Sequence, residues 1–162
     1  MPTVECGFPD AQNRPGSARL VQYGLTLEVR VGFDPHYRPS SNPVPSLSSD
    51  RIPALVDTGA TESCIDSILA DRLYLPFVGE QRFSGISGSS RRRMHLAQIF
   101  VPGLQWVIYG RFAAVDLISG GQPHAVLLGR TFLRGFRMIY EGRSGRVIIE
   151  NESSVVPTAR PM

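Results

Sequence analysis

The chain has 162 residues, of which 42% are apolar, 16 are glycine and 13 are proline. This length suits one compact domain and is short for two, and so many glycines and prolines argue against a helical bundle and favour strands joined by turns. The net charge of +3 gives no reason to expect a nucleic-acid partner. All 17 basic residues are arginine, a bias typical of GC-rich coding sequences such as those of many bacteria.

Cysteines and histidines are few and scattered. Cys6 and Cys64 imply no disulfide framework, and His36, His95 and His124 are too isolated from one another to form a spaced zinc site. We therefore expect neither a metal nor another cofactor. The N-terminus lacks the apolar core of a signal peptide, and no stretch approaches the roughly 18 apolar residues of a membrane span. These features predict a cytoplasmic protein without a membrane partner.

In chain order, the sequence predicts an arm, one domain and a tail. Residues 1–17 are polar and contain three prolines, which predicts a flexible N-terminal arm, and residues 152–162 are expected to fray as a C-terminal tail. Residues 18–151 form the single domain. Within it, apolar and polar residues alternate over Leu20–Val31, the pattern of a half-buried strand. Residues 33–51 hold four prolines, which predicts a long surface loop inserted between strands.

The middle of the chain combines a short apolar strand with a glycine-rich hairpin. Ile52–Val56 predicts a core strand, and Glu62–Leu75 has a partly helical spacing of apolar residues. Residues 81–101 predict a β-hairpin whose tip, residues 84–90, is rich in glycine and serine. This hairpin is either an ordinary surface turn or a segment that closes over a ligand. On its returning strand, Arg91–Arg93 predicts a solvated face, with a substrate-facing role as the alternative.

The C-terminal half supplies further strands. Trp106–Leu117 and Ala125–Gly129 are apolar, and the second is short and ends on glycine. Arg130–Gly135 predicts one or two helical turns. Phe136–Tyr140 and Arg146–Glu150 flank a turn with two glycines, which predicts a closing hairpin. The pattern as a whole favours an all-β fold with one or two short helices.

The main candidate for function is the stretch Ala54–Ala60, an apolar strand that ends on Asp57 and is followed by Thr58 and Gly59. The carboxylate is either a catalyst or the cap of an Asx turn that satisfies backbone amides. As a catalyst, it could be oriented by the Thr58 hydroxyl while Gly59 allows another backbone to approach closely. As a cap, it would be followed by a Gly59 of positive φ. The triplet Asp-Thr-Gly is by itself a weak signal.

Three segments together resemble the retropepsin-like aspartic proteases, the retroviral-type, clan AA relatives of pepsin that work as single-domain homodimers. They are Ala54–Ala60, the glycine-tipped hairpin Phe83–Ser90, and Val126–Leu133, in which an apolar-apolar-glycine sequence is followed by arginine. The resemblance spans about residues 20–151. It implies a mostly β fold: a closed retropepsin-like (acid protease) β-barrel with a flap hairpin and one or two short helices. The two apolar segments would run past one another beneath the active-site turn.

The resemblance also implies roles for single residues. Asp57 is the expected catalytic carboxylate, supported by Thr58, which would brace the paired turns of a dimer, by Gly59, and by Arg130, which would anchor the short helix to the active-site loop. The implied substrate-binding residues are Ala60, Thr61, Glu62, Gly85, Ile86, Ser87, Gly88 and Leu127. Retroviral members carry acidic residues directly after the alanine, whereas this chain has threonine there. Glu62 is therefore the nearest candidate in sequence for an ionic partner of Arg130.

The chemistry of this family needs two aspartates, and the chain has one such turn. The resemblance therefore implies a two-fold homodimer in which Asp57 of each chain meets at the axis. Water activated between the two carboxylates would hydrolyse the peptide bonds of an extended peptide or protein. The terminal segments, above all Arg146–Glu150, are the candidate interface strands, because they would otherwise leave exposed edges.

Two other functions remain open from the sequence. A retropepsin-like dimer can bind peptides or proteins, or assemble a larger complex, without turnover. A serine or cysteine hydrolase would need a recognisable nucleophile turn such as Gly-x-Ser-x-Gly, which this sequence lacks. Cys64 suits a small buried side chain better than a nucleophile.

Overall fold

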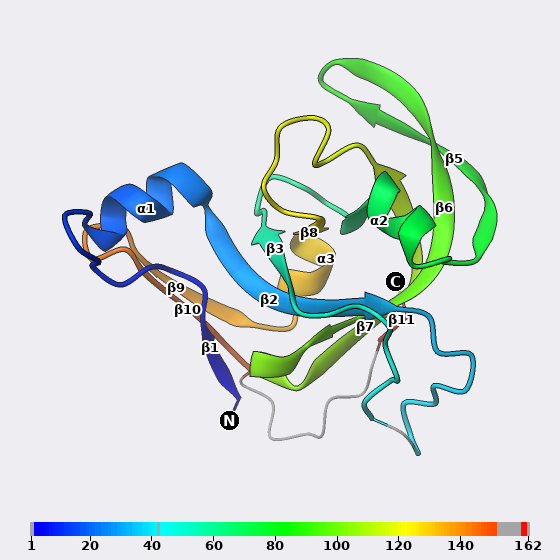
Figure 1. Cartoon of the computed structure of the whole chain (residues 1–162), viewed down its shortest axis with the longest axis horizontal. Helices are drawn as coiled ribbons and strands as arrows, with labels where there is room; N and C mark the ends of the chain where they lie inside the picture. The colour runs from blue at the N-terminus through cyan, green and yellow to red at the C-terminus, as the bar shows by residue number, and fades with distance from the viewer. Residues whose placement is uncertain (1, 42, 152–159, 162) are drawn as a thin grey trace.

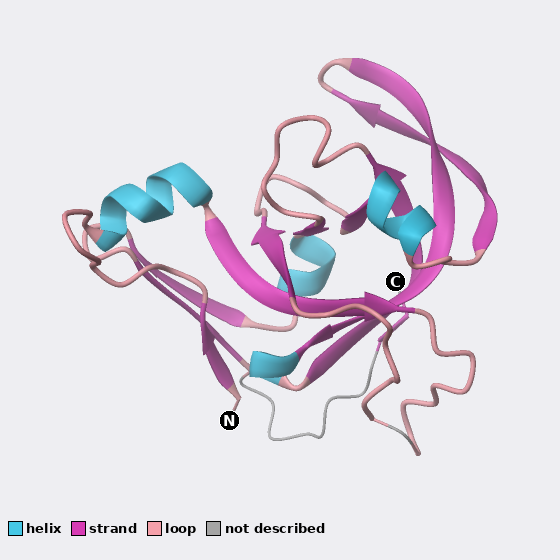
Figure 2. Ribbon diagram, in the orientation of Figure 1, coloured by secondary structure: helices cyan, strands magenta, loops and turns pink. Residues whose placement is uncertain are grey.

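The computed structural model describes residues 2–41, 43–151 and 160–161. Strands in two β-sheets are the main secondary structure of these residues, and helices are few (Figures 1 and 2), which confirms the predicted mostly β fold class. The helices of this described part are α1 (Gly16–Tyr23), α2 (Ser67–Arg72), α3 (Arg130–Leu133) and the 3-10 turn η1 (Pro102–Leu104). In the described chain, no helix has both the length and the apolar character needed to cross a membrane.

The larger sheet has the strand order β11-β7-β4-β8-β3-β2-β6-β5. Its strands are β2 (Leu25–Gly32), β3 (Ile52–Val56), β4 (Cys64–Asp66), β5 (Phe77–Gly85), β6 (Gly88–Val101), β7 (Trp106–Val115), β8 (Val126–Leu128) and β11 (Arg160–Pro161). The sheet curls until β6 also pairs with β7. It is not a formally closed barrel, since β4 and β8 are three residues long and share only two residue pairs. The expectation of a closed barrel is corrected in this respect.

The smaller sheet has the order β1-β10-β9, with β1 at Thr3–Glu5, β9 at Arg137–Glu141 and β10 at Arg146–Glu150. The predicted closing hairpin is confirmed by the antiparallel pairing of β9 and β10. The expectation that β10 leaves an exposed edge for a dimer interface is wrong, because β1 and β9 of the same chain cover both of its sides. The outer strands of this sheet are β1 and β9.

The N-terminal segment is more ordered than the flexible arm expected for residues 1–17. Its strand β1 pairs with β10, and α1 follows at Gly16. This helix also replaces the beginning of the strand expected over residues 20–31. The helix ends at Gly24, which has φ 72° and donates its N–H to the carbonyl oxygen of Leu20 (2.9 Å). The expected C-terminal tail, residues 152–162, lies outside the described residues except for β11.

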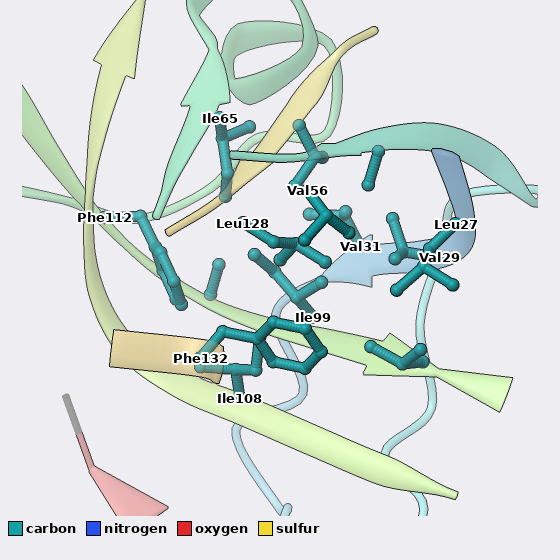
Figure 3. Packing of buried hydrophobic residues seen from close by; sticks show 14 of the residues in the cluster. Leu27, Val29, Val31, Val56, Ile65, Ile99, Ile108, Phe112, Leu128 and Phe132 are labelled. Carbon is teal, nitrogen blue, oxygen red and sulfur yellow. The ribbon is translucent and has the colours of Figure 1, made fainter. Parts of the chain in front are cut away.

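The hydrophobic core is built mainly from the inward side chains of the curled sheet, together with side chains such as Phe132 of α3 and Val147 of β10 (Figure 3). Alternate residues of β2 supply Leu27, Val29 and Val31, which are all buried. Beside them, β3 and β8 run parallel, with Val56 in register with Leu128. Because both side chains are buried, the ends of these two strands are fixed against each other.

The hairpin of β5 and β6 extends from the body of the molecule (Figure 1). It is longer than the predicted residues 81–101, since β5 begins at Phe77, and its turn consists of Ile86 and Ser87 between Gly85 and Gly88. The described residues of the predicted 33–51 loop contain neither helix nor strand. They nevertheless pack on the sheet, as buried Tyr37 and Leu47 form a second apolar cluster with Phe100 and Val107.

Candidate active site

Asp57 stands directly after β3, where that strand runs parallel to β8. Its backbone N–H donates to the carbonyl oxygen of Leu128 (2.9 Å), so the pairing continues one residue beyond the strand. The register brings Asp57 next to Gly129. Two segments that are distant in sequence, Ala54–Ala60 and Val126–Leu133, therefore meet at this carboxylate.

The turn after Asp57 is an Asx turn. The Oδ1 atom of Asp57 accepts a hydrogen bond from the N–H of Gly59 (2.8 Å), and the N–H of Ala60 donates to the Asp57 carbonyl oxygen (3.3 Å). No described residue bonds to Oδ2, and the side chain is partly exposed. Asp57 can therefore cap the turn and contact a ligand at the same time, because Oδ1 holds the turn while Oδ2 is available.

Gly59 does not have a positive φ, so glycine is favoured at this position for another reason. A Cβ at this position would lie 3.1 Å from Oδ1 of Asp57, closer than ordinary van der Waals contact. The expectation of a positive φ is therefore wrong. Glycine is favoured here because the backbone approaches the carboxylate closely.

Gly129 fixes the loop that follows Asp57. A Cβ on Gly129 would lie 2.6 Å from the carbonyl oxygen of Glu62, so a side chain there would collide with backbone. The N–H of Gly129 donates to Oγ of Ser63 (3.1 Å), whose side chain is buried. The N–H of Arg130 donates to the carbonyl oxygen of Ala60 (2.9 Å). These contacts hold the loop against the start of α3.

The side chain of Arg130 holds the same loop from α3. Its Nη1 donates to the carbonyl oxygens of Thr58 (2.9 Å) and Gly59 (2.8 Å), and its Nη2 donates to Oγ1 of Thr61 (2.8 Å). The guanidinium makes no ion pair with Glu62, the candidate suggested by the sequence; all three acceptors are neutral oxygens. The planar fork of arginine suits such a set of acceptors better than a point charge does.

A cavity of about 680 Å³ lies between this loop and the β5–β6 hairpin. The predicted site residues that line it are Gly59, Thr61, Glu62, Gly85, Ser87 and Gly88. The predicted residues outside its lining are Asp57, Thr58, Ala60, Ile86, Leu127 and Arg130. Ile86 is fully exposed at the hairpin tip, and Leu127 lies within the sheet, in register with Leu55 and Cys64.

The lining also includes side chains that sequence reasoning did not assign to a site. They are Ser63 and Cys64 after the loop, Gln81, Phe83 and Ser84 of β5, Ser90 and Met94 of β6, and Arg111, Ala113 and Val115 of β7. Arg92 of β6 also lines the cavity, and for it a substrate-facing role was the alternative that the sequence left open. Every second residue faces the cavity over residues 88–94 of β6 and 111–115 of β7, so the period-two pattern of these strands was the available signal. It did not indicate which of the two faces would be the inner one.

Cys64 is a poor candidate for a nucleophile. Burial raises the pKa of its thiol to about 11; the charge of Arg92 acts in the opposite direction, and Asp57 and Asp66 raise the pKa further. A cysteine hydrolase needs the thiolate at working pH. The thiol instead forms part of the cavity wall.

Asp66 lies near this site but its carboxylate is structural. It is buried, its Oδ2 accepts from the N–H of Leu69 (3.2 Å) at the start of α2, and its Oδ1 accepts from the N–H groups of Leu117 and Ile118 (both 3.0 Å). Among the described residues, no three His, Cys, Asp or Glu side chains gather as metal ligands.

Comparison with solved structures gives matches to retroviral and bacterial proteases. A retropepsin-like aspartic protease from Rickettsia conorii is 13% identical, with a TM-score of 0.47 over 91% of this chain and 90% of that one. Simian foamy virus (mac) protease is 15% identical, with a TM-score of 0.43 over 67% of this chain and 91% of that one. EIAV protease, complexed with the inhibitor HBY-793, is 19% identical, with a TM-score of 0.44 over 67% of this chain and 84% of that one.

The comparison with curated proteins gives no match. The sequence does match the family described as aspartyl protease over residues 46–132, which is 87 of the 162 residues. This range contains the Asp57 turn, the β5–β6 hairpin and the Gly129–Arg130 segment that supports the turn. Because the match extends over more than half of the chain, this protein belongs to the aspartyl protease family.

Proposed function

We propose that this protein is an aspartic endopeptidase that acts as a homodimer, with Asp57 of each chain as a catalytic carboxylate. The observation that carries the proposal is the geometry of the Asp57 turn. Gly59 holds one carboxylate oxygen, the other has no hydrogen bond from a described residue, and the loop opens onto the cavity beneath the hairpin. Membership in the aspartyl protease family supports the same conclusion.

The homodimer follows from the number of carboxylates. Water activation of this kind needs one group as base and another as acid, and a single carboxylate cannot be both at once. Each chain has one Asp-Thr-Gly turn, and nearby Asp66 is committed to backbone N–H groups. A second copy therefore supplies the second Asp57, and Thr58, exposed beside it, braces the two turns against each other.

In the mechanism we propose, the two carboxylates share one proton because both cannot ionise at short distance. The ionised carboxylate takes a proton from a water molecule, whose oxygen attacks the scissile carbonyl carbon. The protonated partner hydrogen-bonds the carbonyl oxygen, and the amine leaves after it takes up a proton. No covalent intermediate with the protein forms.

The substrate we propose is an extended peptide beneath the β5–β6 hairpin, which acts as a flap. A Cβ added at Gly85 or Gly88 would meet no atom within 4 Å, so the tip is not packed against the body of the molecule. Ile86 at the tip is fully exposed and can gain apolar contact by closing on a peptide. The peptide would bind as an added strand, with backbone hydrogen bonds to the loop and the hairpin.

The test is cleavage of a diverse peptide library, read by mass spectrometry between pH 4 and 7. The parent protein should cut peptides, and Asp57→Asn should abolish cutting while it remains folded and dimeric by circular dichroism and sedimentation. Cleavage that persists in Asp57→Asn would contradict the proposal. Absence of cleavage by the parent across this pH range would also contradict it, and would favour a dimer that binds without turnover.

A further inference from the structure

The three consecutive arginines of β6 do not lie on one face of the sheet. Arg91 forms an ion pair with Glu80 (3.8 Å), and Arg93 forms one with Asp71 (3.5 Å); all four of these side chains are half or more exposed. Arg92 lies between them on the strand and lines the cavity instead. The alternation of a β-strand separates the three side chains in this way.

Arg92 has no anionic partner among the described residues. Its side chain is half-buried, yet it makes no hydrogen bond or ion pair with any described residue. Arg92 and Cys64 both line the cavity, and the positive charge of Arg92 opposes the larger effect of burial on the pKa of the Cys64 thiol. A partly desolvated cation without a partner is costly unless a ligand supplies the anion.

A second guanidinium faces the same cavity from the neighbouring strand. Arg111 of β7 lines it, and the one hydrogen bond that its side chain makes to a described residue is a long one, from Nη2 to the carbonyl oxygen of Val78 (3.4 Å). Glu62 contributes the one carboxylate of the lining. Two arginines and one glutamate therefore line the cavity, so the net charge of its lining is positive.

We propose that Arg92, together with Arg111, binds an acidic side chain of the peptide, so that the substrates are peptides with Asp or Glu in the segment beneath the hairpin. This inference rests on the proposed function and adds a substrate class to it. Arginine suits the role because its guanidinium can donate two parallel hydrogen bonds to the two oxygens of one carboxylate. The side-chain amide of Asn or Gln has only one acceptor oxygen and cannot accept both bonds in this way.

The experiment compares peptides that differ at one position. Cleavage sites from the library should show Asp or Glu enriched at one fixed position, and exchange of that residue for Asn or Gln should lower kcat/KM by about tenfold or more. In Arg92→Gln this preference should disappear. The matched control is Arg91→Gln, which removes the same charge from the outer face of the same strand and should keep the preference. Arg111→Gln should weaken the preference as well. It tests the site independently, so the inference can still be decided if Arg92→Gln does not fold.

The outcomes separate this inference from the proposed function. Asp57-dependent cleavage without an acidic preference, or with a preference that Arg92→Gln and Arg111→Gln leave intact, would overturn the inference alone. If the parent protein cuts no peptide, the proposed function fails, and fluorescence anisotropy with the same labelled peptides still decides the inference. Tighter binding of the acidic member of each pair, lost in Arg92→Gln and kept in Arg91→Gln, would support it. Equal binding of both members would overturn it.

Discussion

Gly129 lies so close to Glu62 that a Cβ on the glycine would be 2.6 Å from the carbonyl oxygen of the glutamate. We predict that Gly129→Ala lowers the free energy of unfolding by about 1–3 kcal/mol, because the loop after Asp57 must move to admit the methyl group. Urea unfolding measures the change. Gly135→Ala is the matched control: a Cβ there meets nothing within 4 Å, and this variant should stay within about 0.5 kcal/mol of the parent. Equal effects of the two substitutions would contradict the prediction.

Arg130 supports the active-site loop through three neutral oxygens, so its exchange should affect activity more than stability. The side chain is exposed, and its bonds reach Thr58, Gly59 and Thr61. We predict that Arg130→Ala lowers kcat/KM by about 10- to 100-fold, equivalent to one or two lost hydrogen bonds to a charged group. Arg130→Lys should recover only part of this loss. Arg134→Ala, an exposed arginine one turn further along, should match the parent; full activity of Arg130→Ala would count against this role.

His124 should make the fold less stable in acid. Its ring is buried, Nε2 lies 2.8 Å from Oγ1 of Thr26, and Nδ1 has no hydrogen-bond partner in the described structure. Burial lowers the pKa of this imidazole below its usual value of 6.5. The unfolded chain therefore takes up a proton near pH 6.5 that the folded protein does not, and stability is lost as the pH falls from there towards the folded-state pKa.

The measurement for His124 is urea unfolding at pH 7.5 and pH 5.5. The loss of stability between these two values should be smaller in His124→Gln, which has no titrating ring, than in the parent. Thr26→Val loses the hydroxyl beside Nε2 but keeps the titrating ring of His124. It therefore separates the effect of titration from the effect of the lost hydrogen bond. An identical pH dependence in the parent and His124→Gln would refute the assignment.

The two thiols should react slowly in the folded protein. Burial raises the pKa of Cys6 to about 12 and that of Cys64 to about 11, from a usual value of 9.0. The thiolate fraction at pH 7.5 is correspondingly small, and alkylation by iodoacetamide should be at least about tenfold slower than for a free cysteine peptide. Denaturation in urea should restore the ordinary rate. Rapid alkylation of Cys64 in the native protein would reopen the alternative of a cysteine nucleophile.

The parts of the site that follow from local patterns were predictable from the sequence. The apolar run into Asp57 forms β3, and the run into Gly129 forms β8, followed by the short helix that carries Arg130. The glycine-tipped hairpin has formed as expected, because the paired strands β5 and β6 flank a two-residue turn between Gly85 and Gly88. In each case the strand and its ending are encoded within a few neighbouring residues.

Features that depend on distant contacts were not predictable in this way. The strand β1 forms because Thr3–Glu5 pairs with β10 at the other end of the domain, and a polar segment with several prolines gives no local sign of it. The start of helix α1 is packed closely against the segment that follows β1, since a Cβ on Gly16 would lie 2.0 Å from the carbonyl oxygen of Phe8. The position of Arg111 in the cavity likewise depends on the pairing of β7 with β6.

The most direct test of the two-chain site is the activity of mixed dimers. Parent and Asp57→Asn subunits are mixed in equal amounts, allowed to exchange, and assayed at constant total protein on one peptide from the library. If each site needs Asp57 from both chains, only parent–parent pairs are active, and activity should fall to about one quarter of that of the parent. A fall to only about one half, in proportion to the parent subunits present, would show that each chain acts by itself, and a fall to only about three quarters would show that one Asp57 suffices in a shared site; either result would contradict the account.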